Sequence, residues 1–219
     1  MKKVLIFGSS GHAKVVIDIF ERLSYKIIGL LDSNRAKGES TFGYSVLGDE
    51  KNIMELRQSY PDLELFIAIG DNYTRKIIKE KITAIFPDIK FASAIHPFAI
   101  IGKEVKLGQG IAVMGGVVIN SDSTIEDFTI INTRASVGHD CRLEAFSSLS
   151  PNVTLGGNVN IGELSAISIS ATIIHGITIS KYTVIGASSL INKDCQSLSV
   201  YYGNPGKKIG DRKINTPYL

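Results

Sequence analysis

The chain has 219 residues, enough to bury a hydrophobic core in one large domain or two small ones. With 44% hydrophobic and 21% charged residues it has the composition of a globular protein, which excludes a disordered chain. A net charge of +3 is too small to indicate nucleic-acid binding, and no apolar run is long enough to predict insertion into a membrane. Cys141 and Cys195 form neither a disulfide framework nor a zinc motif, and the first apolar run is too short for a signal peptide. We therefore expect a cytoplasmic protein.

The first ninety residues alternate between strand-like and helix-like segments. Short apolar runs predict strands at 3–7, 26–31 and 63–69, and apolar residues at helical spacing predict helices at 12–23, 50–60 and 73–86. Pro61 and Pro87 end the last two helices. This order predicts a small Rossmann-like parallel sheet, an α/β domain over residues 1–94.

A six-residue repeat begins near Ile95. Every sixth residue is aliphatic: Ile101, Leu107, Val113, Ile119, Ile125, Ile131, Val137, Leu143, Leu149, Leu155, Ile161, Ile167, Ile173, Ile179, Ile185 and Ile191. Chance would place an aliphatic residue at only about five of these sixteen positions. The residue two places earlier is usually small or β-branched, as in Ala135, Cys141 and Ser147. The pattern is typical of short parallel strands stacked in coils, three strands to a coil. It predicts an all-β, left-handed parallel β-helix of about five coils over residues 95–198, followed by a closing segment, 199–219.

The loop between the first strand and the first helix is suited to phosphate. Gly8 to Ala13 leaves backbone N–H groups at a helix N-terminus, where anions bind. The spacing differs from the GxGxxG of dinucleotide sites, so a nicotinamide oxidoreductase is disfavoured. Asp32 ends the second strand, where such folds place a carboxylate on a ribose hydroxyl or a base edge.

Four motifs occur in a fixed order: FGSSGHA from Phe7, IGDNYTR from Ile69, NTRASVGHDC from Asn132, and GNPGK from Gly203. Together they resemble the PglD- and NeuD-like sugar acetyltransferases, which acetylate nucleotide-linked 4-amino-4,6-dideoxy sugars or sialic acid. The resemblance implies a homotrimer with active sites between subunits and acetyl-CoA as co-substrate, with no metal. It also implies that the first domain binds the nucleotide-sugar. The residues expected there are Ser10, Gly11, His12, Asp32, Ser33, Gly70, Asp71, Asn72 and Arg75, the last for a phosphate.

His139 and Asp140 are the candidate catalytic pair. Acetyl transfer to an amine needs a route out for the amine proton, and an imidazole oriented by a carboxylate provides one. We expect His139 to act as general base and Asp140 to orient it, as the family's histidine followed by an acidic residue implies. A solvated corner of the coil is the alternative for both side chains.

The donor site follows from the resemblance alone. The family's second histidine, nine residues after the first, is replaced here by Ser148, which leaves one hydroxyl to contact the donor. The acetyl-CoA groove is expected at Ile169 and Ala187, with Pro205 near the adenine and Lys207 and Lys208 at the phosphates.

The sequence thus predicts an acetyl-CoA-dependent N-acetyltransferase acting on a UDP-, dTDP- or GDP-linked amino sugar in surface glycan synthesis, such as O-antigen or capsule. Three alternatives were weighed. O-acetylation of sialic acid would need nearly the same machinery. A carbonic anhydrase on the same β-helix needs three zinc-binding histidines, whereas only His139 and His175 lie well inside the coils. A nonenzymatic scaffold would need the repeat but no histidine–acid pair.

Overall fold

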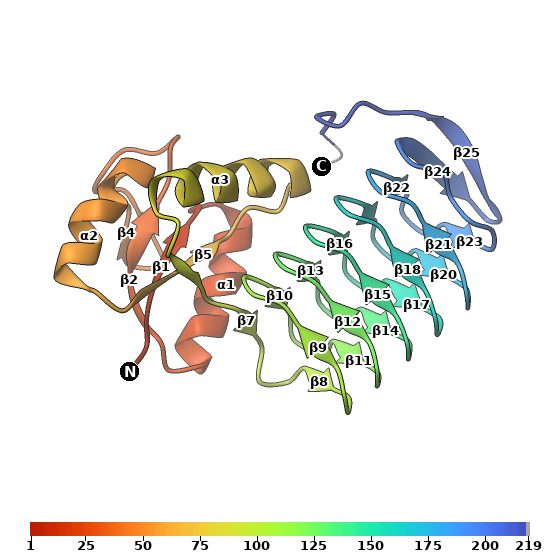
Figure 1. Ribbon diagram of the computed structural model, residues 1–219, viewed down its shortest axis with the longest axis horizontal. Helices are drawn as coiled ribbons and strands as arrows, with labels where there is room; N and C mark the ends of the chain where they lie inside the picture. Colours follow the sequence, from red (N-terminus) through yellow and green to blue (C-terminus); the bar gives the residue numbers. More distant parts are fainter. Residues whose placement is uncertain (218–219) are drawn as a thin grey trace. The chain divides into compact units, whose positions relative to one another are not determined.

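The computed structural model describes residues 1–217 and forms two compact units. The first comprises Met1–Gly70 and Thr74–Pro97, and the second comprises Asp71–Tyr73 and the chain from Phe98 onward (Figure 1). The change from the first unit to the second after Pro97 lies close to the boundary expected after residue 94.

The N-terminal unit is built on a parallel sheet of four strands in the order β2-β1-β5-β6 (Figure 1). Its strands are β1 (Lys3–Phe7), β2 (Lys26–Leu31), β5 (Leu63–Ile67) and β6 (Lys90–Phe91), with a small hairpin of β3 (Ser40–Thr41) and β4 (Tyr44–Ser45), and β7 (Ala94–Ile95). Its helices are α1 (Gly11–Arg22), the 3₁₀ turn η1 (Glu50–Asn52), α2 (Ile53–Ser59) and α3 (Asn72–Ile85). The predicted α/β order is confirmed, and the β3–β4 hairpin was not foreseen.

Apolar periodicity explains the core of this unit. Helix α1 buries Val16, Ile17 and Phe20 along one face, and Phe20 meets Phe66 of β5 edge to face with ring centroids 5.4 Å apart. Because β1, β2 and β5 are parallel, their carboxyl ends share one edge of the sheet. The loops that follow them therefore gather there, as ligand-binding loops do in such sheets.

The second unit is a parallel β-solenoid, as the repeat predicts. Each of the sixteen aliphatic positions is the second residue of a two-residue strand, and all but the first two are buried. One sheet contains β8 (Ile100–Ile101), β11 (Val118–Ile119), β14 (Ser136–Val137), β17 (Thr154–Leu155), β20 (Thr172–Ile173) and β23 (Leu190–Ile191). A second contains β9 (Lys106–Leu107), β12 (Thr124–Ile125), β15 (Arg142–Leu143), β18 (Asn160–Ile161) and β21 (Thr178–Ile179). A third includes β10 (Ala112–Val113), β13 (Ile130–Ile131), β16 (Ser148–Leu149), β19 (Ala166–Ile167) and β22 (Val184–Ile185).

The corners between strands share one backbone conformation. The third residue after each aliphatic position from Ile101 to Ile185 has a positive φ, from Glu104 (58°) to Ser188 (55°), with glycine at Gly110, Gly116 and Gly176. This left-handed residue turns the chain from one face to the next. Strand partners such as Ile119 and Val137 are one coil of eighteen residues apart. Equivalent corner residues of successive coils therefore stack in columns.

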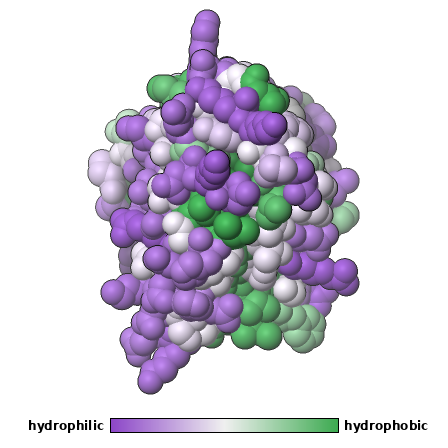
Figure 2. Space-filling model, turned by 90° about the vertical axis from the view of Figure 1, so that its right-hand side faces the viewer, coloured by the Kyte–Doolittle hydropathy of each residue, from purple (hydrophilic) through white to green (hydrophobic). Residues whose placement is uncertain are grey.

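A hairpin closes the solenoid. Strand β24 (Ser199–Gly203) pairs with β22, and β25 (Gly206–Asp211) runs antiparallel to β24. The surface at this end is largely hydrophilic, with hydrophobic side chains gathered in places (Figure 2). Within residues 1–217, no helix has the length and apolar character needed to cross a membrane.

Candidate active site

His139 and Asp140 occupy one corner of the solenoid, directly after β14. The Nδ1 atom of His139 lies 2.5 Å from Oδ2 of Asp140. Asp140 has the left-handed φ of its corner position, 58°, so the turn that the repeat requires also sets the carboxylate beside the ring. The side chains are 62% and 56% exposed, which leaves them accessible to a substrate. An imidazole whose Nδ1–H donates to a carboxylate has Nε2 available to accept a proton.

The loop after β1 and the residue after β2 meet at the carboxyl edge of the N-terminal sheet. Ser9 Oγ donates to Asp32 Oδ2 over 2.5 Å, and the backbone N–H of Asn34 donates to Asp32 Oδ1 over 2.9 Å. Gly8 has a φ of 108°, and a Cβ there would lie 2.7 Å from the carbonyl oxygen of Ala68. Glycine is therefore required where this loop passes the end of β5. Asp32 is held at the edge of the loop, where the sequence placed it.

The N-terminus of α1 presents its backbone to the same loop. Ser10 is the N-cap but its side chain makes no capping hydrogen bond, and the first turn contains no acidic residue. An anion here would meet the positive end of the helix dipole with no carboxylate in the first turn of the helix to repel it.

His12 and Arg75 lie behind this loop. Burial and the nearby Arg75 lower the pKa of His12 to about 4, so its imidazole is neutral at neutral pH. Its Nε2 is buried and has no hydrogen-bond partner among residues 1–217. Arg75 is 1% exposed, and its Nη1 donates to the carbonyl oxygens of Ile69 and Gly70, each over 2.9 Å. These contacts give Arg75 a part in holding the loop after β5; its expected phosphate contact stays a prediction.

The remaining acceptor candidates lie in different surroundings. Asn72 is buried and its Nδ2 donates to the carbonyl oxygen of Ser165 over 3.1 Å. Asp71 and Asn72 group with the solenoid unit. Ser33 is exposed and its Oγ donates to Glu50 Oε2 over 3.2 Å. Their roles in binding stay predictions.

A hollow beside the loop reveals side chains that sequence reasoning missed. Ser9, Ser10 and Gly11 line it together with Lys14, Arg35, Ser40, Thr41 and Phe42. Arg35 is fixed by Glu39, whose Oε2 lies 2.8 Å from Nε, and by Thr41, whose Oγ1 accepts from Nη1 over 2.8 Å. Lys14 Nζ lies 5.9 Å from the centre of the Phe42 ring. Two cations thus flank the helix N-terminus. Lys14, one turn into the helix, was a usable signal in the sequence, but the hairpin that presents Arg35 and Phe42 was not.

The expected donor residues lie at another corner of the solenoid. Ile169 and Ala187 follow β19 and β22 by two residues, so they stack one coil apart, and both are exposed. Ser148 begins β16 of the same sheet. This corner connects the sheet of β16, β19 and β22 to the sheet of β14, β17 and β20. His139 lies at the next corner along the chain, which connects the sheet of β14 to the sheet of β15. Base and donor residues of one chain therefore occupy different corners.

The closing hairpin holds the expected phosphate and adenine contacts. Pro205 and Lys207 are exposed. Lys208 Nζ lies 2.7 Å from Asp211 Oδ1 and donates to Gln196 Oε1 over 3.2 Å. Part of the Lys208 charge is thus already compensated within the chain.

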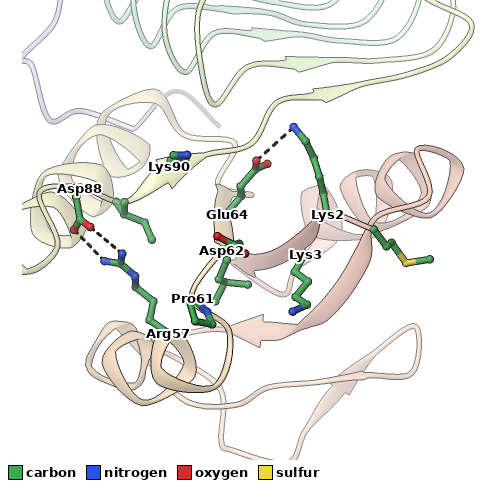
Figure 3. A pocket seen from close by; sticks show the side chains of 11 residues that line it. Lys2, Lys3, Arg57, Pro61, Asp62, Glu64, Asp88 and Lys90 are labelled. Atoms are coloured by element: carbon green, nitrogen blue, oxygen red, sulfur yellow. Dashed lines mark hydrogen bonds and ion pairs between the residues drawn. The ribbon is translucent and has the colours of Figure 1, made fainter.

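A separate pocket lies at the opposite edge of the N-terminal sheet (Figure 3). It is lined by the amino ends of β1, β5 and β6 and contains two ion pairs: Arg57 donates to both carboxylate oxygens of Asp88, and Lys2 Nζ lies 3.4 Å from Glu64 Oε1. The carboxyl ends of the strands, Asp32 and the loop of Gly8 to Ala13 are at the other edge, so this pocket lies away from the residues that the sequence predicts for the nucleotide.

Known proteins resemble this chain in part or nearly throughout. The family of PglD N-terminal domains matches residues 3–82. UDP-N-acetylbacillosamine N-acetyltransferase of Bacillus subtilis is 33% identical over 115 residues, which are 52% of this chain and 52% of that protein. The chain thus matches about half the length of that curated relative.

Two solved structures match nearly the whole chain. Perosamine N-acetyltransferase from Caulobacter crescentus, solved as a histidine-to-asparagine variant with CoA and GDP-perosamine, is 38% identical, with a TM-score of 0.90, covering 95% of this chain and 97% of that one. The acetyltransferase domain of PglB from Neisseria gonorrhoeae is 31% identical, with a TM-score of 0.86, covering 95% and 100%. The chain therefore belongs to the PglD-like family of hexapeptide-repeat sugar acetyltransferases.

Proposed function

We propose that this protein transfers the acetyl group of acetyl-CoA to the amine of a nucleotide-linked 4-amino-4,6-dideoxy sugar, in the synthesis of a surface glycan. The observation on which this rests is the His139–Asp140 pair, with Nδ1 and Oδ2 2.5 Å apart on an exposed solenoid corner. GDP-perosamine and CoA bound to the Caulobacter crescentus relative support the substrate class.

In the proposed reaction the neutral sugar amine attacks the thioester carbonyl. Nε2 of His139 accepts the amine proton while the C–N bond forms. The C–S bond then breaks, and the imidazolium returns that proton to the departing sulfur, which leaves as the thiol of CoA. Asp140 holds the Nδ1 proton and stabilises the imidazolium that forms. No covalent enzyme intermediate is needed because the thioester is already activated.

The acceptor would be held by the N-terminal unit. The diphosphate fits the N-terminus of α1, where Lys14 and Arg35 add two positive charges. Asp32, held by Ser9, offers a free lone pair to a ribose hydroxyl or to an N–H of the base.

The separation of the two corners supports a homotrimer. His139 and the expected donor residues Ile169 and Ala187 lie at different corners of one prism, so a single chain does not place both beside one groove. Two chains packed side by side could pair the His139 corner of one with the donor corner of the other. This is the arrangement that we propose.

The test mixes the purified protein with acetyl-CoA and each of a panel of acceptors, and follows free thiol. The panel contains UDP-, dTDP- and GDP-linked 4-amino-4,6-dideoxy sugars, free sialic acid and CMP-linked sialic acid. Thiol release with one amino sugar is the expected result and identifies the nucleotide. Release only with sialic acid would replace the proposal with O-acetylation. Acetyl-CoA binding without release from any acceptor would contradict the proposed substrate class.

A further inference from the structure

The corner that contains His139 forms a column of equivalent residues, one per coil. Its members each lie two residues after the aliphatic position of a strand: Lys103, Ser121, His139, Gly157, His175 and Lys193. The corner accepts side chains of several sizes, and Gly157, which neighbours His139, is the one member without a side chain.

The backbone does not explain this glycine. The φ of Gly157 lies outside the left-handed range, so an alanine would meet no conformational penalty there. A Cβ built on Gly157 would instead lie 2.5 Å from Nε2, 2.7 Å from Cε1 and 3.0 Å from Cδ2 of His139. Its three nearest neighbours all belong to the imidazole ring, which lies where the missing side chain would be.

Three other glycines of the solenoid serve a different purpose. Cβ atoms at Gly138, Gly156 and Gly162 would meet the backbone of the next coil, at 2.3, 2.6 and 2.5 Å. Those glycines allow the coils to stack at their normal spacing. Gly157 differs from these three glycines because it makes room for the imidazole of His139.

The ring of His139 is therefore located by two neighbours. Asp140 holds its Nδ1 edge, and Gly157 leaves space under its Nε2 edge. His175, the next member of the column, has its ring centre 6.4 Å from that of His139, with the planes inclined by 47°. A methyl group at position 157 would force the His139 ring to rotate, which moves Nε2 or breaks the contact with Asp140.

We propose that Gly157 is a positioning residue for the general base. The His139 ring can take its catalytic position only because the next coil has no side chain at residue 157. This inference rests on the proposed function. It predicts a defect in the chemical step without a defect in substrate binding or folding. Displacement of a catalytic group by about 1 Å costs on the order of a hundredfold in rate.

The experiment compares Gly157→Ala with Gly162→Ala, which makes the same change where the Cβ meets the backbone at Lys181. For Gly157→Ala we expect kcat to fall roughly ten- to hundredfold, with KM for both substrates within about twofold and the thermal midpoint within about 2 °C of wild type. For Gly162→Ala we expect the thermal midpoint to fall by several degrees or more while kcat per folded molecule is retained. A wild-type kcat in Gly157→Ala would overturn the inference.

A double-mutant cycle tests whether Gly157 acts through His139. In the His139→Asn background, Gly157→Ala should lower kcat by less than about twofold, because the base is already absent. An undiminished effect in that background would show that Gly157 acts elsewhere.

A readout without substrate separates this inference from the proposed function. In protein with ¹³C-labelled histidine, the His139 ring signal, assigned by its loss in His139→Asn, should shift in Gly157→Ala and stay in place in Gly162→Ala. An unmoved signal would refute the positioning role even if the enzyme is active. A moved signal in a protein that acetylates no sugar would support the positioning and refute the function.

Discussion

In the solenoid, every corner side chain has counterparts one coil before and one coil after it, whereas each loop of the N-terminal unit occurs once. A functional residue in the solenoid is therefore defined by departure from a repeat: a histidine–acid pair at one corner and a missing side chain beside it. In the N-terminal unit a functional site is instead formed where different segments meet. Ser9 and Asp32 come from the ends of two strands, and Arg35 comes from the loop after the second strand. We therefore expect the solenoid to supply the chemical step and the N-terminal unit to supply the affinity for the acceptor.

The largest effect is expected at the solenoid corner. His139→Asn should lower kcat by roughly two to four orders of magnitude, the usual contribution of a general base. Because asparagine fills similar space without accepting the proton, acetyl-CoA affinity by calorimetry and the oligomeric state by light scattering should stay as in wild type. If turnover were normal, another group would be taking the proton and the solenoid would lose its assigned role.

The N-terminal unit should be the acid-sensitive part of the molecule. The folded-state pKa of His12 is lowered to about 4 from an ordinary 6.5, so an unfolded chain takes up this proton first as the pH falls. The stability contributed by neutral His12 is complete above about pH 6.5 and is lost as the pH falls toward 4, by about 3 kcal/mol.

Urea unfolding at pH 7.5 and 4.5, followed by circular dichroism at 222 nm, measures this because all the described helices end by Ile85. His12→Gln should show a smaller difference in unfolding free energy between the two pH values than wild type. An equal difference would assign the acid sensitivity to other groups.

A smaller effect should separate binding from chemistry. Arg35→Ala and Lys14→Ala should each raise KM for the nucleotide-sugar by about tenfold, the cost of one charge-assisted hydrogen bond, with kcat and KM for acetyl-CoA little changed. Lys2→Ala, in the pocket at the opposite sheet edge, is the matched control and should behave as wild type. A fall in kcat without a rise in KM for the acceptor would contradict the assignment of acceptor binding to the N-terminal unit and of chemistry to the solenoid.

The smallest effect is expected in the closing hairpin. Lys207→Ala should raise KM for acetyl-CoA about threefold, and Lys208→Ala should raise it less, because Asp211 already compensates part of the Lys208 charge. Both effects should shrink in added salt, since they are exposed electrostatic interactions. Equal effects of the two substitutions would show that the Lys208–Asp211 pair opens when CoA binds.

The solenoid was predictable because one six-residue period determines where the strands, the corners and the inward-facing residues lie. Ile101 and Ile191, at its two ends, are each the second residue of a two-residue strand. Asp140 was predictable as a partner of His139 because they are adjacent in sequence. The role of Gly157 was not, since it depends on a contact across eighteen residues of chain that only the coil spacing reveals.

The hollow at Lys14 and Arg35 was missed for a related reason. Its shape depends on the β3–β4 hairpin, whose strands have two residues each and leave no periodic signal. Arg75 shows the opposite difficulty: its motif indicated a phosphate ligand, while its buried contacts with two carbonyl oxygens also fit a purely structural role.

The hairpin of β24 and β25 has a consequence for assembly that is independent of CoA. A stack of coils has no natural end, because its final strands offer unpaired backbone groups to any further coil, including one from another molecule. In the β22 sheet the chain supplies β24 as the next strand and then reverses direction with β25, so the edge it presents no longer matches an incoming coil. The hairpin of β24 and β25 thus covers one of the three sheets at this end of the solenoid against the addition of a further coil.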